Sequence, residues 1–270
     1  MVLAVLALSQ QCEKILNELA LPNLVVIPLR QIEEKNKQLY KAKKNRSLVE
    51  YYFTLTPLLI KEALDTIPNA KRATYLDSDL YFHHSPEALW EEIGSAPMAF
   101  VEHRFSEEYR DKIAYGRFNV GWNTFDQSTT AQKALNWWAE RCIEWCYDRI
   151  EGEKFADQGY LTKIEKQFEG VHIIEYPGIN LAEYNLDNYY LSLDKNGPYA
   201  NNRPVIYWHM HCLFENQDGS FKTLLRPDLM KDPVIEWAYR FYVHKLQTIS
   251  KRLEQLGYEI DRGNARYPKL

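Results

Sequence analysis

Short apolar runs alternate with amphipathic segments at the start of the chain. Residues 3–8 form a continuous apolar run of the kind found in buried strands. Ser9 then offers an N-cap for a helix with apolar residues at Ile15 and Leu19, and residues 23–28 form the next apolar run. This β-α-β rhythm predicts a mostly parallel sheet with right-handed crossover connections.

The same rhythm continues to about residue 176. Helices are predicted over residues 48–64, 86–93, 129–150 and 155–168, and strands over residues 72–76, 98–101, 118–125 and 172–176. Residues 177–230 are irregular and rich in Asn, Tyr and Pro, with one strand expected over residues 205–209. A long amphipathic helix is predicted over residues 233–256. We therefore expect an α/β fold: one domain over residues 1–230 and a helical extension over residues 231–270, packed on it.

The composition is that of an ordinary globular protein. Of 270 residues, 46% are hydrophobic and 26% are charged, and 33 Lys and Arg against 37 Asp and Glu give a net charge of −4. This balance argues against a nucleic-acid partner, which usually requires a basic excess. No apolar run approaches the roughly 18–20 residues needed to cross a bilayer. The first apolar run also lacks the basic residues and cleavage site of a signal peptide.

Four cysteines occur at positions without a C-x-x-C spacing, namely Cys12, Cys142, Cys146 and Cys212. Reduced thiols in a cytosolic core are expected, ahead of a disulfide or a zinc site. Residues 31–46 are strongly charged and form either a solvated surface or a surface for an anionic ligand.

The segment over residues 75–82 carries the clearest chemistry. An apolar strand ends in Asp77 and Asp79, and residues two apart in an extended chain point to the same side. The carboxyl edge of an open α/β sheet is where ligands bind, and two hard oxygen ligands there form half of a site for Mg²⁺ or Mn²⁺. The alternative is that Asp77-Ser78-Asp79 is simply a turn, with Asp77 capping the segment that follows.

Several motifs occur along the chain in a fixed order and support a functional role for the D-x-D segment, Asp77-Ser78-Asp79. They are Arg46-x3-Glu50-Tyr-Tyr-Phe-Thr-Leu-Thr-Pro57, Tyr75-Leu-Asp-Ser-Asp79, Phe118-Asn-Val-Gly121, Phe155-Ala-Asp-Gln158-Gly-Tyr-Leu161, and a looser Asn180-Leu-Ala-x2-Asn185 followed by Trp208-His-Met-His211. The ordered set resembles the GT-A class of nucleotide-sugar-dependent glycosyltransferases, particularly bacterial lipopolysaccharide-type enzymes related to glycosyltransferase family eight.

The resemblance implies that Asp77 and Asp79 hold Mn²⁺ or Mg²⁺ against the donor diphosphate, where a cation neutralises charge on the leaving group. His209 is the best match for the histidine that completes the metal site, and His211 is the next. Residues two apart on a strand point both rings to the same side, which fits such a site. The alternative is that His209 is a packed histidine beside Trp208.

The resemblance also implies residues that contact the donor: Ser78, Asn119 and Gly121. Arg46 would bind the donor phosphates, since guanidinium binds phosphate through two hydrogen bonds, or would pair with Glu50 instead.

Asp157 and Gln158 match the acid-amide pair beside the donor sugar, where a carboxylate binds hydroxyls or stabilises an oxocarbenium-like centre. The alternative for Asp157 is a cap of the helix over residues 155–168. Acceptor contacts are expected from an amide- and phenol-bearing set comprising Asn180, Tyr184 and Asn185.

The implied function is transfer of a sugar from a nucleotide-diphosphate sugar, with UDP-sugar as the expected donor, to a glycan or glycolipid acceptor. The reaction would be metal-dependent and retaining, and would belong to cytoplasmic steps of bacterial cell-surface glycan synthesis.

Family members begin with a strand-helix unit that precedes the one at Leu3, and we expect this chain to lack the contacts that this unit makes to the nucleotide. A nucleotidyltransferase of the same fold is one alternative, but it would need a Gly-rich basic N-terminal loop, which this sequence does not show. A degenerate, non-catalytic glycan-binding or partner-binding protein is the other alternative.

The predicted C-terminal helix combines aromatic and basic residues. Trp237, Tyr239, Phe241 and Tyr242 lie close to Arg240, Lys245, Lys251 and Arg252. This composition suits peripheral contact with the inner membrane surface, whereas the alternative is that the aromatic residues pack on the domain.

Overall fold

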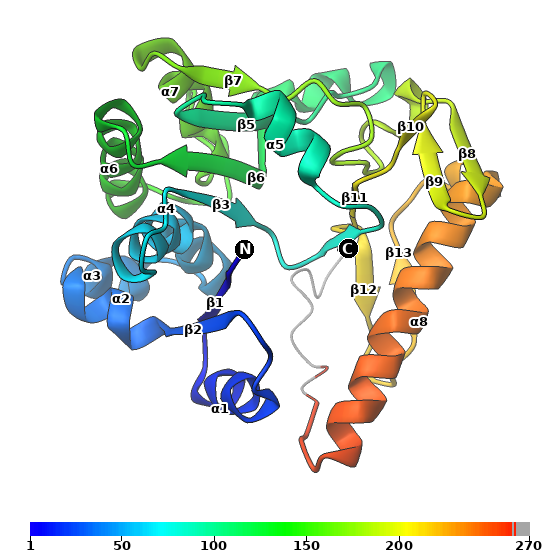
Figure 1. Cartoon of the computed structure of the whole chain (residues 1–270), viewed down its shortest axis with the longest axis horizontal. Coiled ribbons are helices and arrows are strands. Elements are labelled where there is room, and N and C mark those ends of the chain that lie inside the picture. The colour runs from blue at the N-terminus through cyan, green and yellow to red at the C-terminus, as the bar shows by residue number, and fades with distance from the viewer. Residues whose placement is uncertain (261, 263–270) are drawn as a thin grey trace. The chain divides into compact units, whose positions relative to one another are not determined.

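The computed structural model describes residues 1–260 and residue 262, and it divides into two compact units (Figure 1). The first unit comprises Met1–Tyr75, Ser95–Phe100 and Ala114–Ile173. The second comprises Leu76–Gly94, Val101–Ile113 and the described part of Ile174–Leu270. The last residues of the predicted C-terminal extension, 261 and 263–270, lie outside the described part. The predicted domain boundary at residue 230 stays a prediction.

The first unit opens with the predicted β-α-β motif. β1 (Leu3–Ala7) pairs in parallel with β2 (Leu24–Pro28), and α1 (Gln10–Leu19) connects the two strands. The Ser9 hydroxyl accepts a hydrogen bond from the Cys12 backbone N–H at 3.1 Å, which confirms the predicted N-cap.

The main sheet contains β3 (Arg72–Leu76), β6 (Phe118–Asp126), β5 (Met98–Glu102) and β7 (Val171–Ile173), in this order. β5 and β7 are parallel. β6 is buried along nearly its whole length rather than on alternate residues, because side chains cover both of its faces. Together with the helices, these strands confirm the predicted α/β class.

Helices complete the first unit. They are α2 (Leu29–Lys35), α3 (Leu39–Asn45), α4 (Leu48–Thr66), α6 (Thr129–Glu144) and α7 (Leu161–Gln167), with a short 3-10 helix, η2 (Gln158–Tyr160). The charged segment over residues 31–46 therefore lies mostly in α2 and α3. Its lysines include Lys35, which pairs with Glu62 of α4 at 2.5 Å. α6 ends at Glu144 rather than at the predicted Ile150.

The second unit is built from short strands and one long helix. Its elements are β4 (Leu80–Phe82), α5 (Glu87–Ile93), β8 (Leu191–Asp194), β9 (Gly197–Ala200), β10 (Arg203–Pro204), β11 (Tyr207–His209), β12 (Leu213–Glu215), β13 (Phe221–Thr223), the 3-10 helices η3 (Leu186–Asn188) and η4 (Leu229–Lys231), and α8 (Pro233–Gln255). A further 3-10 helix, η1 (Glu107–Tyr115), begins in the second unit, and its last two residues belong to the first unit. The strand pairs β4–β11, β8–β9, β9–β10 and β12–β13 are antiparallel.

α8 (orange to red in Figure 1) begins where the sequence predicts it. The Asp232 carboxylate accepts hydrogen bonds from the backbone N–H groups of Val234 at 2.8 Å and Ile235 at 3.2 Å, which caps the helix. Tyr239 and Tyr242 are buried against a core that includes Trp208. The packing alternative is therefore confirmed for these two tyrosines, and membrane contact stays a prediction. Within the described residues, no helix combines the length and the apolar character needed to span a bilayer.

Arg46 fixes the point at which α6 ends. Its guanidinium donates to the Thr54 hydroxyl and to the backbone carbonyls of Cys142 at 2.7 Å and Ile143 at 2.6 Å. These carbonyls belong to the last turn of α6, which has no partners for them within the helix. The alternative ion pair with Glu50 is not formed, since the Glu50 carboxylate accepts from the backbone N–H groups of Ser47 and Asp148.

We expect Arg46→Ala to lower the free energy of unfolding by about 3 kcal/mol, because it leaves buried carbonyls without donors. Urea denaturation followed by circular dichroism measures the change. The exposed Arg110→Ala is the matched control and should shift stability by less than about 0.5 kcal/mol. Wild-type stability of Arg46→Ala combined with lost nucleotide binding would contradict the structural role and favour the phosphate-binding one.

Candidate functional site

The two aspartates of the D-x-D motif lie in the connection between β3 and β4. β3 ends at Leu76 and β4 begins at Leu80, so that Asp77, Ser78 and Asp79 form the link, with a turn at its second and third residues. The turn alternative is therefore correct about the backbone. The turn nevertheless leaves both carboxylates close to the same histidine.

Strand pairing brings that histidine to the aspartates. β4 and β11 are antiparallel, and their register places His209 opposite Leu80. The backbone N–H of Met210 also donates to the carbonyl of Asp79 at 3.0 Å. His209 thus lies opposite the residue that directly follows the motif, although the two segments are far apart in the sequence.

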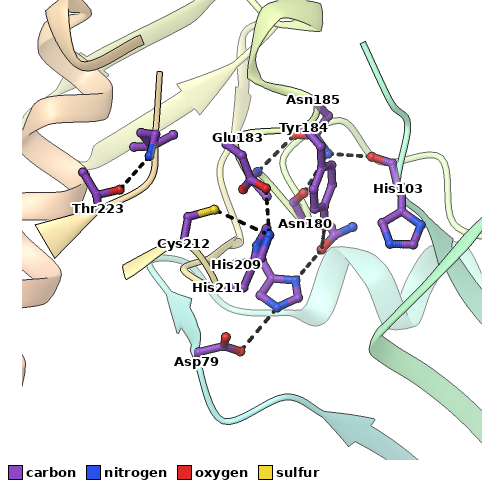
Figure 2. Close-up of polar contacts among 12 residues, drawn as sticks. Asp79, His103, Asn180, Glu183, Tyr184, Asn185, His209, His211, Cys212 and Thr223 are labelled. Carbon is purple, nitrogen blue, oxygen red and sulfur yellow. Dashed lines mark hydrogen bonds and ion pairs between the residues drawn. The ribbon is translucent and has the colours of Figure 1, made fainter. Parts of the chain in front are cut away.

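Both carboxylates lie close to one nitrogen atom of the His209 ring. His209 Nε2 lies 3.3 Å from Asp79 Oδ1 and 3.6 Å from Asp77 Oδ2. Neighbouring ligands of an octahedral ion at 2.0–2.1 Å are about 3 Å apart. One ligand atom from each residue lies within 4.8 Å of the other two, so the set fits a divalent cation after small movements. Figure 2 shows the contact between Asp79 and His209.

The electrostatics of this cluster also favour a cation. Burial alone would lower the pKa of His209, but the charges of Asp79 and Asp77 outweigh it and raise that pKa. Burial alone would raise the pKa of Asp79, but His209 and His211 outweigh it and lower that pKa to about 2. In its protonated form His209 would compensate the carboxylates, and a bound cation would take the place of that proton.

Asn180 orients the His209 ring. Its Oδ1 atom lies 3.1 Å from His209 Nδ1 and accepts a hydrogen bond from the Tyr184 hydroxyl, also at 3.1 Å. Its Nδ2 donates to the Glu102 carbonyl at 3.2 Å. An acceptor facing Nδ1 places the ring proton there, so that in the neutral ring the Nε2 lone pair faces Asp77 and Asp79.

Asn185 ties the same segment together. Its Nδ2 donates to the carbonyls of His103 and Asn180, both at 2.8 Å, and its Oδ1 accepts from the Ala182 backbone N–H at 3.0 Å. Asn180, Tyr184 and Asn185 are all buried. The structure therefore places the three predicted acceptor-binding residues in a network around His209, and their contact with an acceptor stays a prediction.

The remaining predicted residues occupy defined places. Ser78 is exposed in the second unit. In the first unit, Asn119 Oδ1 accepts from the Gly121 backbone N–H at 2.7 Å. Asp157 is buried before η2 and makes no side-chain capping bond, contrary to the cap alternative. Gln158 Nε2 donates to the Tyr115 carbonyl at 2.7 Å. The roles of these residues toward a donor stay predictions.

Two of the predicted ligand-binding residues have structural roles instead. Arg46 and Asn180 are predicted to contact ligands, whereas the structure gives both a set of partners within the protein. Asn180 adopts a positive φ of 53°, which Asn tolerates better than most residues. The Asn-rich pattern around it was the available signal for such a backbone role.

The fold and site together define an α/β protein with a carboxylate–histidine site that suits a divalent cation. The chain is 30% identical over 250 residues to the uncharacterized protein YfnD of Bacillus subtilis (strain 168), covering 91% of this chain and 79% of YfnD. It is 29% identical over 214 residues to the uncharacterized protein YfnF of the same organism, covering 76% of this chain and 70% of YfnF. The chain belongs to the same family as YfnD.

No protein-family model matches the sequence. Among solved structures, the chain is similar to mouse xyloside xylosyltransferase 1 in its apo form, with a TM-score of 0.46 and 14% identity over 78% of this chain and 85% of that one.

Replacing Asn180 should weaken both the fold and the metal site. We expect Asn180→Ala to lower the free energy of unfolding by about 2–4 kcal/mol, because His209, Tyr184 and the Glu102 carbonyl lose a partner at a backbone position that disfavours Ala. Mn²⁺ affinity should fall about 10- to 100-fold. Urea denaturation and the electron paramagnetic resonance signal of free Mn²⁺ measure the two effects.

Asn180→Gly separates the causes, since Gly accepts the positive φ but also lacks the amide. It should recover about 1 kcal/mol of stability relative to Asn180→Ala and none of the Mn²⁺ affinity. Wild-type Mn²⁺ affinity in both variants would show that Asn180 does not orient His209.

Proposed function

We propose that this protein is a metal-dependent glycosyltransferase with a GT-A-like catalytic arrangement. It would move a sugar from a nucleotide-diphosphate sugar, with UDP-sugar as the first donor to test, to a glycan or glycolipid. The observation that carries the proposal is the convergence of Asp77, Asp79 and His209 on one point. The ordered motifs that resemble glycosyltransferase family eight support the same assignment and add the expectation of retained anomeric configuration.

Each residue of the cluster has a distinct task in this proposal. Asp77 and Asp79 would supply hard oxygen ligands, and His209 Nε2 would supply a nitrogen ligand held in place by Asn180. A nitrogen ligand favours Mn²⁺ over Mg²⁺, whose sites are built mainly from oxygen. The bound cation would neutralise charge on the departing nucleoside diphosphate.

The remaining assignments rest on the resemblance. Asp157 and Gln158 would act beside the anomeric carbon, where a buried carboxylate stabilises developing positive charge more strongly than one in water. Ser78, Asn119 and Gly121 would contact the donor. The Arg46 guanidinium donates to the Thr54 hydroxyl and to the carbonyls of Cys142 and Ile143, so the proposal gives it no contact with the donor phosphates.

The acceptor would bind near the segment that contains Asn180, Tyr184 and Asn185. The reaction would take place in the cytoplasm, and at the inner membrane surface where the acceptor is a glycolipid.

Nucleotide binding tests the proposal directly. Calorimetric titration of UDP, GDP and CDP, each with and without Mn²⁺, should reveal one nucleotide that binds only with the metal. Asp79→Asn preserves the size of the side chain and should weaken that binding more than about 100-fold, because a ligand is lost. Asp111→Asn, at an exposed position, is the matched control and should bind as the wild type does. Equal nucleotide binding in Asp79→Asn would remove the metal assignment, and no binding in the wild type would favour the non-catalytic alternative.

Chelation tests the chemistry itself. Release of free nucleotide from a panel of UDP-, GDP- and CDP-sugars should cease in EDTA, because the leaving diphosphate then lacks its counter-charge. Added Mn²⁺ should restore the rate to a greater extent than Mg²⁺ does. A rate that is unchanged by EDTA would exclude metal-assisted departure of the leaving group.

A further inference from the structure

A second group of metal-ligand side chains lies within the second unit, next to the cluster described above. It consists of Glu183, His211 and Cys212, and one potential ligand atom of each lies within 4.8 Å of the other two. Figure 2 shows the three side chains converging from two segments, one around Asn180 and one that follows β11. The proposed transferase reaction uses none of them.

The distances within this group are close to those of a tetrahedral zinc site. Cys212 Sγ lies 3.7 Å from His211 Nε2. Ligand bonds of 2.3 Å for sulfur and 2.0–2.1 Å for nitrogen place these two atoms about 3.6 Å apart around Zn²⁺. Glu183 Oε1 lies 2.7 Å from His211 Nε2, and the two would separate by about 0.6 Å to admit the ion.

Buried polar atoms without partners lie in the same group. Glu183 is only 8% exposed, and its second carboxylate oxygen, Oε2, is buried without a hydrogen-bond partner. The Nδ1 atom of His211 is in the same state. Leaving a buried carboxylate oxygen without a donor is costly, and a cation bound by the Glu183 carboxylate would offset part of that cost.

We propose that Glu183, His211 and Cys212 form a zinc site separate from the Asp77–Asp79–His209 site. The sulfur and imidazole ligands select Zn²⁺ over Mn²⁺ and Mg²⁺, whereas the first site offers no sulfur. On binding, the Cys212 thiol would release its proton to the solvent, and the proton on His211 Nε2 that faces Glu183 would leave to the solvent or move to Nδ1. Three protein ligands leave the fourth position of the ion for water.

The position of this site gives it a structural consequence. Glu183 belongs to the segment whose Leu181 carbonyl accepts the backbone N–H of His209 at 2.9 Å. His211 and Cys212 follow His209 directly, and the His209 and His211 rings lie 5.1 Å apart. Zinc would therefore join the two segments that hold His209.

Co²⁺ substitution tests the site, because only a sulfur ligand gives a thiolate-to-cobalt charge-transfer band. The full-length chain, freed of metal with a chelator under reducing conditions, is titrated with Co²⁺ and then with Zn²⁺. We expect the band to reach its maximum at one equivalent of bound cobalt, and Zn²⁺ to bleach it. Asp79→Asn should retain the band, so this result is independent of the proposed transferase function.

Variants assign the sulfur and nitrogen ligands. Cys212→Ser should abolish the band, whereas Cys12→Ser, a matched thiol in the first unit, should retain it. His211→Gln should weaken Zn²⁺ binding more than about 100-fold. A cooperative denaturation curve recorded in EDTA shows that each metal-free variant is folded. The titration of the wild type needs no variant.

Three results would overturn the proposal. They are no charge-transfer band in the wild type, a band that persists in Cys212→Ser, and a band that disappears in Asp79→Asn. Loss of Mn²⁺-dependent UDP binding in Asp79→Asn reports only on the first site, so failure of one assignment is distinguishable from failure of the other.

Discussion

The pairing of β4 with β11 is the constraint on which the site depends. A ladder of three residue pairs sets His209 against Leu80, directly beside the D-x-D motif. Two neighbouring carboxylates repel one another, and the pairing places His209 Nε2 within 3.6 Å of both of them. Because side chains alternate along a strand, a shift of one residue in this register would turn His209 away from Asp79 and leave the carboxylates without a counter-charge.

Buried amides make that arrangement rigid. An asparagine in the interior must satisfy both its donor and its acceptor groups, and Asn180 and Asn185 do so by joining His209 to the carbonyls of Glu102 and His103. The same residue types that bind sugar hydroxyls at a surface thus hold a histidine in place when they are buried. Residue type alone does not distinguish these two uses, whereas burial and partners do.

Local signals account for what the sequence predicted well. Ser9 and Asp232 cap helices by contacting residues two or three positions away, so the starts of α1 and α8 are encoded locally. The end of α6 is different, because Arg46 reaches its last carbonyls from nearly a hundred residues earlier in the chain. The short strands after residue 190 are likewise defined by pairing with partners rather than by long apolar runs.

Within the candidate sites, too, some residues could be grouped from the sequence and others only from the structure. The sequence grouped Asp77, Asp79 and His209 through the resemblance, and the structure brings the three side chains together. The cluster of Glu183, His211 and Cys212 has no recognisable spacing, since the glutamate reaches the other two residues only through the fold. Short motifs carry information when a family reuses them, whereas a site assembled from separate segments becomes visible only after folding.

If both proposed groups bind metal, ligand chemistry rather than affinity alone would decide which ion each one holds. Zn²⁺ binds most nitrogen and oxygen ligands more tightly than Mn²⁺ does, so the Asp77–Asp79–His209 site would not exclude zinc by itself. A neighbouring site with a thiolate offers zinc a more favourable set of ligands, because sulfur discriminates strongly against Mn²⁺ and Mg²⁺. On the proposed assignments, Cys212 therefore serves the first site as well, since it gives zinc a better alternative and leaves the carboxylates for a hard cation.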